Sequence, residues 1–143
     1  MGSKIATAFI AGAFFTFFLD FFLFLGLFLN YIEAQNIDVY YNILFADHQS
    51  LILFFLGVIL FGYLFIFYKS TKIAALVFAV CFALVNLSLI PSIGYSLGEM
   101  VFRVDNKILK ENNHTYIGHI VYEGRNIVWF FDDELNSMVE IKK

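Results

Sequence analysis

Asp20 is the residue whose chemistry most needs an explanation, because it lies inside the apolar run FFTFFLDFFLFLG of residues 14–26. An ionised carboxylate near the centre of a bilayer costs about 2.5–3.5 kcal/mol. We therefore expect Asp20 to be protonated and hydrogen-bonded within this chain, or paired with a group of another subunit. A third use is a proton or ion relay, although a relay usually needs several ionisable groups and this run offers one.

A second set of polar side chains has the types that bind metals, namely His114, His119 and the run Asp132–Glu134. Their spacing matches no ligand pattern, and histidines five residues apart on a strand point to opposite faces. We expect the acidic run to form a solvated turn. The sequence also has no Gly-rich phosphate loop, no nucleophile elbow and no H-E-x-x-H motif. We predict a protein that is not an enzyme and that needs no metal or cofactor.

The composition places these residues in a membrane protein, since 61% of the 143 residues are hydrophobic and 20% are aromatic. A helix needs about 20 apolar residues to cross the hydrocarbon core. Three segments approach or exceed that length, and we predict a transmembrane helix for each: 5–29, 51–68 and 73–93. None of them contains a Lys, Arg or His that could neutralise Asp20. The net charge of −3 gives no indication of a nucleic-acid partner.

Helical spacing gives Asp20 a set of neighbours on one face of the first segment. Small residues at every fourth position allow two helices in a membrane to approach closely. The third segment has a similar stripe that ends in a polar residue at a similar depth. We expect the two stripes to pack together or against a partner, with a polar contact between Asp20 and Asn86; the residues are Ala8, Gly12, Thr16, Asp20, Ala75, Ala79, Ala83 and Asn86.

The C-terminal part is polar and strand-like. Residues 114–122 and 126–131 are rich in β-branched and aromatic side chains, and 100–104 and 138–142 are further candidate strands. Between the first two, Gly124 could supply the positive φ of a tight hairpin turn. The predicted fold class is a membrane all-α domain of three transmembrane helices (1–98), followed by a small antiparallel β domain (99–143). About 45 residues is near the lower limit for an independent core, so we expect the sheet to lean on the helices or on another protein.

The charges indicate an orientation. Lys4, Lys69 and Lys72 fall on one side of the three segments, whereas the acidic loop 30–50 falls on the other, as the positive-inside rule requires of a cytoplasmic N-terminus. An odd number of helices then places the β domain outside, with Arg103, Lys107 and Lys110 close to the membrane. The basic count is therefore three against three, and a motif in the β domain decides. Within it, ENNHT (111–115) contains an N-x-T sequon at Asn113 with an acid two positions earlier. This string resembles the extended acidic sequon that is glycosylated in the periplasm of epsilonproteobacteria.

The layout and the sequon together resemble small inner-membrane glycoproteins of epsilonproteobacteria, and within them the membrane chaperone of the flagellar stator. That resemblance implies a chain that binds stator subunits in the inner membrane and protects them, with Asn113 as a glycosylation site. From the residues alone we predict an accessory subunit that binds and stabilises another integral membrane complex within the lipid bilayer. The alternative is a homo-oligomeric transporter or ion-conducting protein in which Asp20 lines the path.

Overall fold

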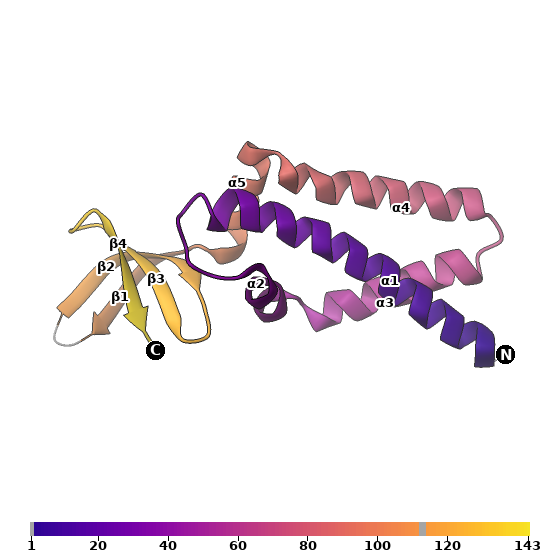
Figure 1. Ribbon diagram of the computed structural model, residues 1–143, viewed down its shortest axis with the longest axis horizontal. Coiled ribbons are helices and arrows are strands. Elements are labelled where there is room, and N and C mark those ends of the chain that lie inside the picture. Colours follow the sequence, from indigo (N-terminus) through magenta and orange to yellow (C-terminus); the bar gives the residue numbers. More distant parts are fainter. Residues whose placement is uncertain (1, 112–113) are drawn as a thin grey trace.

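The computed structural model describes residues 2–111 and 114–143, and it consists of a helical part followed by a four-stranded sheet (Figure 1). The helical elements are α1 (Gly2–Leu27), the π-helix η1 (Phe28–Ile32), α2 (Tyr41–His48), α3 (Leu51–Ile66), α4 (Thr71–Asn86), the 3-10 helix η2 (Leu87–Leu89) and α5 (Pro91–Phe102). The strands are β1 (Val104–Glu111), β2 (His114–Glu123), β3 (Ile127–Asp132) and β4 (Ser137–Lys142).

Two helical segments are long and apolar enough to cross a membrane. The first, Gly2–Ile32, joins α1 to η1 and has 31 residues, so it is about 46 Å long at the helical rise of ~1.5 Å per residue. The second, Thr71–Leu89, joins α4 to η2 and has 19 residues. These two helices cover most of the predicted transmembrane segments 5–29 and 73–93. The first is longer than the hydrocarbon core, which is about 30 Å thick.

The second predicted segment is less simple than its hydropathy suggests. α2 and α3 meet at a bend of 85°, and the two helices make a third span only if the bent pair is counted as one. Gln49 and Ser50 at the bend have extended backbone, and the Ser50 hydroxyl caps α3 by accepting a hydrogen bond from the Leu53 amide. With 16 residues α3 measures about 24 Å, which is shorter than the hydrocarbon core.

The third predicted helix, 73–93, is wrong at its C-terminal end. Pro91 begins a separate helix, α5, and Ile90 before it is extended because proline disfavours helical geometry in the preceding residue. α5 runs across residue 98 to Phe102, so the predicted strand 100–104 is also wrong except for its last residue. A Cβ on Gly98 would overlap the Tyr31 side chain, which shows how closely this helix packs against η1.

The sheet is an antiparallel meander in the order β1-β2-β3-β4. The predicted hairpin between β2 and β3 forms, and the Gly124 amide donates to the Ile127 carbonyl over 2.9 Å. However, no described glycine has a positive φ, so the expected role of Gly124 is wrong. Glycine instead provides room, because a Cβ there would lie 3.1 Å from the Ile127 oxygen and 3.3 Å from the Trp129 ring.

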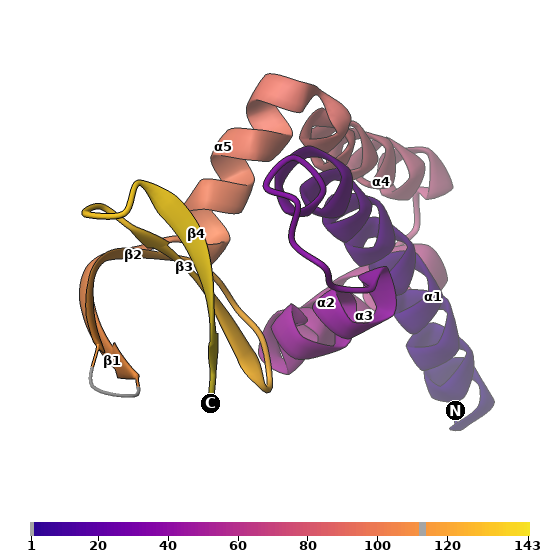
Figure 2. The ribbon, with the colours of Figure 1, turned by 60° about the vertical axis from the view of Figure 1, so that its left-hand side comes forward.

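One hydrophobic core joins the sheet to the ends of the helices. Its buried members come from α1, η1, the following loop, α2, α5, β2 and β3, and include Leu27, Tyr31, Phe102, Tyr122 and Trp129. The Tyr31 hydroxyl donates a hydrogen bond of 2.9 Å to the Val121 carbonyl of β2. The sheet therefore leans on the helices as expected, and it lies at the opposite end of the molecule from the N-terminus and the α3–α4 turn (Figures 1 and 2).

Candidate functional site

The small-residue face of α1 packs against α3. Ala8, Gly12 and Thr16 are all buried. A Cβ on Gly12 would overlap the Val58 carbonyl, and one on Gly62 would overlap the carbonyl of Ala8. The two backbones therefore cross in direct contact, which is the arrangement that small residues permit in membrane helices. The partner of this face is α3, whose own Gly57 and Gly62 supply the matching small surface.

Asp20 lies at the C-terminal end of this face of α1, next to the bend between α2 and α3. Its Oδ2 accepts a hydrogen bond of 2.9 Å from the side-chain amide of Gln49, which is the last residue before Ser50 at the bend. The Tyr41 hydroxyl of α2 donates to the Phe21 carbonyl over 2.9 Å and fastens the same region to α1. Asp20 thus provides a polar partner for a broken helix, at a point where the chain leaves regular backbone hydrogen bonding.

The expected contact between Asp20 and Asn86 does not form, and this prediction is corrected. The Asn86 amide donates to the Phe82 carbonyl, one turn earlier in its own helix, over 2.7 Å. A side-chain amide that bonds its own backbone needs no partner across the membrane. Gln49, which sequence reasoning missed, takes the place of Asn86. The 85° bend brings it to α1, and hydropathy carries no signal for such a bend.

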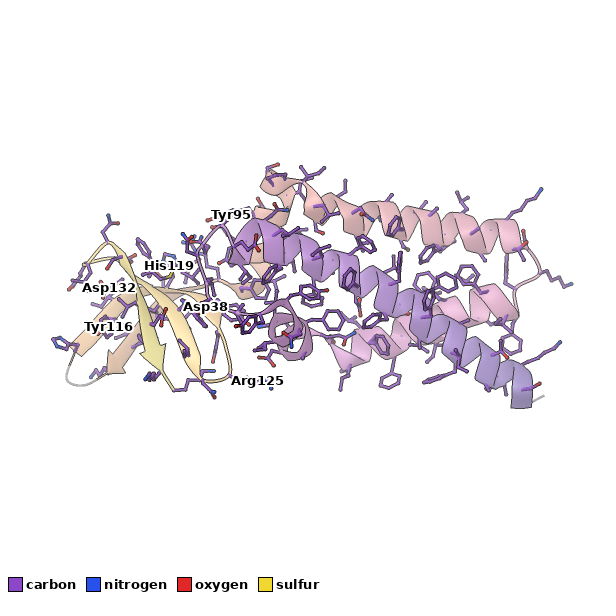
Figure 3. All side chains as sticks on the ribbon, in the orientation of Figure 1. Asp38, Tyr95, Tyr116, His119, Arg125 and Asp132 are labelled. Atoms are coloured by element: carbon purple, nitrogen blue, oxygen red, sulfur yellow. The ribbon has the colours of Figure 1, made fainter. Side chains whose placement is uncertain are left out.

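The two predicted stripes also do not meet. Ala75, Ala79 and Ala83 are exposed, and α4 contacts the other helices through a different face. That face carries aromatic rings: the centroids of Phe78 and Phe15 are 4.8 Å apart, and other pairs pack similarly, namely Phe82 with Phe18 and Phe22, and Phe78 with Phe61 and Phe65. Bulky rings between the helices hold α4 away from close backbone contact, and the layer is visible in Figure 3.

The sheet is fastened to α2 by a polar junction. Arg125, in the turn between β2 and β3, is hydrogen-bonded to the Asp47 carboxylate near the end of α2 (Figure 3). The His48 ring lies 4.9 Å from the Phe102 ring and 5.4 Å from the Tyr122 ring, centroid to centroid. Burial raises the pKa of Tyr122 to about 12, with the Asp47 charge adding to the shift and Arg125 opposing it. Tyr122 is therefore a neutral core residue.

The acidic run Asp132–Glu134, which begins at the last residue of β3, is only partly exposed to solvent. Asp132 is 3% exposed, and its Oδ1 accepts hydrogen bonds from the amides of Glu134 and Leu135, at 2.7 and 3.0 Å. Its carboxylate therefore organises the turn to β4, whereas Asp133 and Glu134 are exposed. The Nδ1 atom of His119 lies 3.9 Å from the Oδ1 atom of Asp133. In the described part of the chain, no three His, Cys, Asp or Glu side chains gather where they could hold a metal ion.

The residues predicted to make contacts differ in whether the rest of the chain covers them. The predicted sequon residue Asn113 lies outside the described residues. Asp20 is engaged within its own chain, the α1 stripe is covered by α3, and the alanines of α4 stay uncovered. Comparison with protein-family models, curated proteins and solved structures finds no match to this chain.

Proposed function

We propose that this chain is a non-enzymatic, multi-pass membrane accessory protein that binds and stabilises another integral membrane complex through α4. The observation that carries the proposal is the exposure of Ala75, Ala79 and Ala83 on a helix that the rest of the chain holds by its aromatic face. Small residues at every fourth position let a second helix approach closely, and hydrogen bonds, dispersion and lipid entropy then favour association. Within this chain no described helix uses that surface.

The finer topology of the proposal rests on one motif, because the basic charges alone do not decide it. Lys4, Lys69 and Lys72 belong to the end formed by the N-terminus and the α3–α4 turn, and the sheet lies at the other end (Figure 1). Arg103, Lys107 and Lys110 balance them at the sheet end, so the positive-inside count is three against three. The sequon at Asn113 resembles a periplasmic site and favours a cytoplasmic N-terminus and a periplasmic sheet in a bacterial inner membrane, with the bent pair α2–α3 counted as the third span. The stator units of the flagellar motor are the partner that the resemblance of the sequence suggests, with Asn113 as a glycosylation site.

Co-purification tests the accessory role. The tagged chain, extracted from its native membrane in a mild detergent, should carry one other membrane complex in a fixed ratio. Ala79→Phe places a bulky ring on the proposed contact and should lower the yield of that complex at least tenfold. Ala6→Phe, which adds the same ring at an exposed alanine of α1, is the matched control and should leave the yield unchanged.

Two outcomes would contradict the proposal. If Ala79→Phe and Ala6→Phe retain the complex equally, the α4 face is not the contact. If the chain instead purifies as a large homo-oligomer, and ion flux through reconstituted vesicles is lost in Asp20→Asn, the conducting alternative is favoured. The hydrogen bond from Gln49 to Asp20 supports the accessory role over that alternative, because it engages the carboxyl group inside one chain.

A further inference from the structure

An apolar groove opens between α1 and α3 near the N-terminal end of α1. Its volume is about 270 Å³, and its floor lies where Gly62 contacts the backbone of Ala8. The Tyr63 hydroxyl is the one polar side-chain group of the lining, which consists of Ile5, Ala8, Phe9, Val58, Ile59, Gly62, Tyr63 and Phe67. The groove therefore suits a flexible hydrocarbon chain along most of its length.

The end of the molecule that holds the groove is basic. Lys4 directly precedes the lining residue Ile5, and Lys69 follows the lining residue Phe67 by two positions. Lys72 lies in the first turn of α4, and all three lysines are exposed. No Asp or Glu occurs in residues 1–19 or 48–98, which contain this end and extend well beyond it. The lysines therefore keep an unopposed positive charge beside the mouth of the groove.

The charges beside the groove, rather than its volume, indicate its occupant. An apolar transmembrane helix offers no partner for three lysines, whereas an anionic lipid carries both a hydrocarbon chain and a negative charge. An extended acyl chain can follow the wedge between two crossing helices. The lysines then meet the headgroup, because basic residues next to the membrane attract anionic lipid.

We propose that this groove binds one anionic phospholipid, with an acyl chain between α1 and α3 and the phosphate group among Lys4, Lys69 and Lys72. Acyl chains are as apolar as the groove, so the bilayer already satisfies them and the headgroup charges decide which lipid is retained. The lining of the groove contains no residue of α4, and the proposal stands whether or not the chain is an accessory protein.

Native mass spectrometry of the full chain in detergent tests the site, with phosphatidylglycerol and phosphatidylcholine of identical acyl chains as probes. Each lysine near an anionic headgroup contributes about fivefold in affinity. We expect phosphatidylglycerol to be retained at least tenfold better than phosphatidylcholine. Lys4→Gln, Lys69→Gln and Lys72→Gln combined should remove the preference. The matched control, Lys107→Gln, Lys110→Gln and Lys142→Gln combined, alters three exposed lysines of the sheet and should keep it.

A second pair of variants tests the groove itself. Ile59→Trp adds bulk to the lining and should lower phosphatidylglycerol binding, whereas Leu60→Trp, next to it but outside the lining, should not. Equal retention of both lipids would overturn the proposal, as would a preference that the sheet lysines control equally. A lipid-free homodimer that Ile59→Trp dissociates would place a second copy in the groove and overturn it too.

Discussion

The α1–α3 crossing can be tested by replacing three glycines with alanine, because the three substitutions should affect stability to different degrees. A Cβ at Gly12 would overlap the backbone of Val58, and neither helix can move away without losing the crossing. A Cβ at Gly57 would lie 2.6 Å from Cγ2 and 2.8 Å from Oγ1 of Thr16, which are side-chain rather than backbone atoms. A Cβ at Gly2 would meet nothing within 4 Å. The same substitution, Gly→Ala, therefore meets backbone, side chain or open space.

The magnitudes follow from two opposing effects. Alanine in a helix interior is favoured over glycine by about 0.8–1 kcal/mol, and a methylene forced into a packed site costs about 1–3 kcal/mol. With rigid backbone on the other side, the upper half of that range applies to Gly12→Ala, which we expect to lower the free energy of unfolding by about 1–2 kcal/mol. Gly57→Ala should cost less than Gly12→Ala, because side-chain atoms of Thr16 rather than backbone oppose the added methyl group. Gly2→Ala should be neutral or slightly stabilising, since it lies at the helix start.

Unfolding in mixed micelles with increasing sodium dodecyl sulfate, followed by circular dichroism, gives the three free energies. The ranking Gly12→Ala, then Gly57→Ala, then Gly2→Ala, from least to most stable, is the expected result. Equal stability of Gly12→Ala and Gly2→Ala would refute the crossing, because it would mean that no backbone lies opposite Gly12.

Three further predictions concern polar contacts. Asp20→Asn keeps an acceptor for Gln49 and should change stability by less than about 1 kcal/mol, whereas Asp20→Leu should lower it by about 1–3 kcal/mol in the same assay. Equal effects would contradict the hydrogen bond. Tyr31→Phe leaves the buried Val121 carbonyl without its donor and should cost about 1–2 kcal/mol; no loss would mean that this carbonyl finds another partner. Because the pKa of Tyr122 is raised from 10.0 to about 12, its contribution is complete below pH 10 and is lost as the pH rises to 12. Unfolding should therefore increase the phenolate absorbance between these pH values, and in Tyr122→Phe this increase should be smaller by one tyrosine. An increase of the same size in Tyr122→Phe and the unsubstituted chain would refute the prediction.

The sequence was sufficient where a local pattern decides the structure. Long apolar runs predicted α1, α3 and α4, and β-branched and aromatic runs predicted β2, β3 and β4, whereas α2 and α5 were not predicted. It failed where two local signals competed. The apolar run through Ile93 concealed the break that Pro91 imposes, although proline at the first position of a helix was a usable signal. Residues 100–102 look strand-like by composition, but they continue the helix that Pro91 begins.

The candidate site was harder to predict because spacing alone does not say which helix a face meets. Ala8, Gly12 and Thr16 meet α3, whose Gly57 and Gly62 carry the same small-residue signal as the alanines of α4. The bend that presents Gln49 to Asp20 contains neither Gly nor Pro, and Ser50 there is a signal for the start of α3 but not for the 85° angle with α2. Phe15 and Phe18 of α1 fill the space toward α4 together with Phe78 and Phe82, and the alanines of α4 lie on another face and stay uncovered.

The central claim, that the exposed alanines of α4 form the contact with another membrane complex, is tested most directly by photo-cross-linking in the native membrane. A photoreactive side chain replaces Ala79 in one strain and Ala6 in another, and the products are identified by mass spectrometry. We predict one protein product, a subunit of another membrane complex, from position 79 and none from position 6. Products from position 79 that contain lipid alone, or the same proteins from both positions, would contradict the claim.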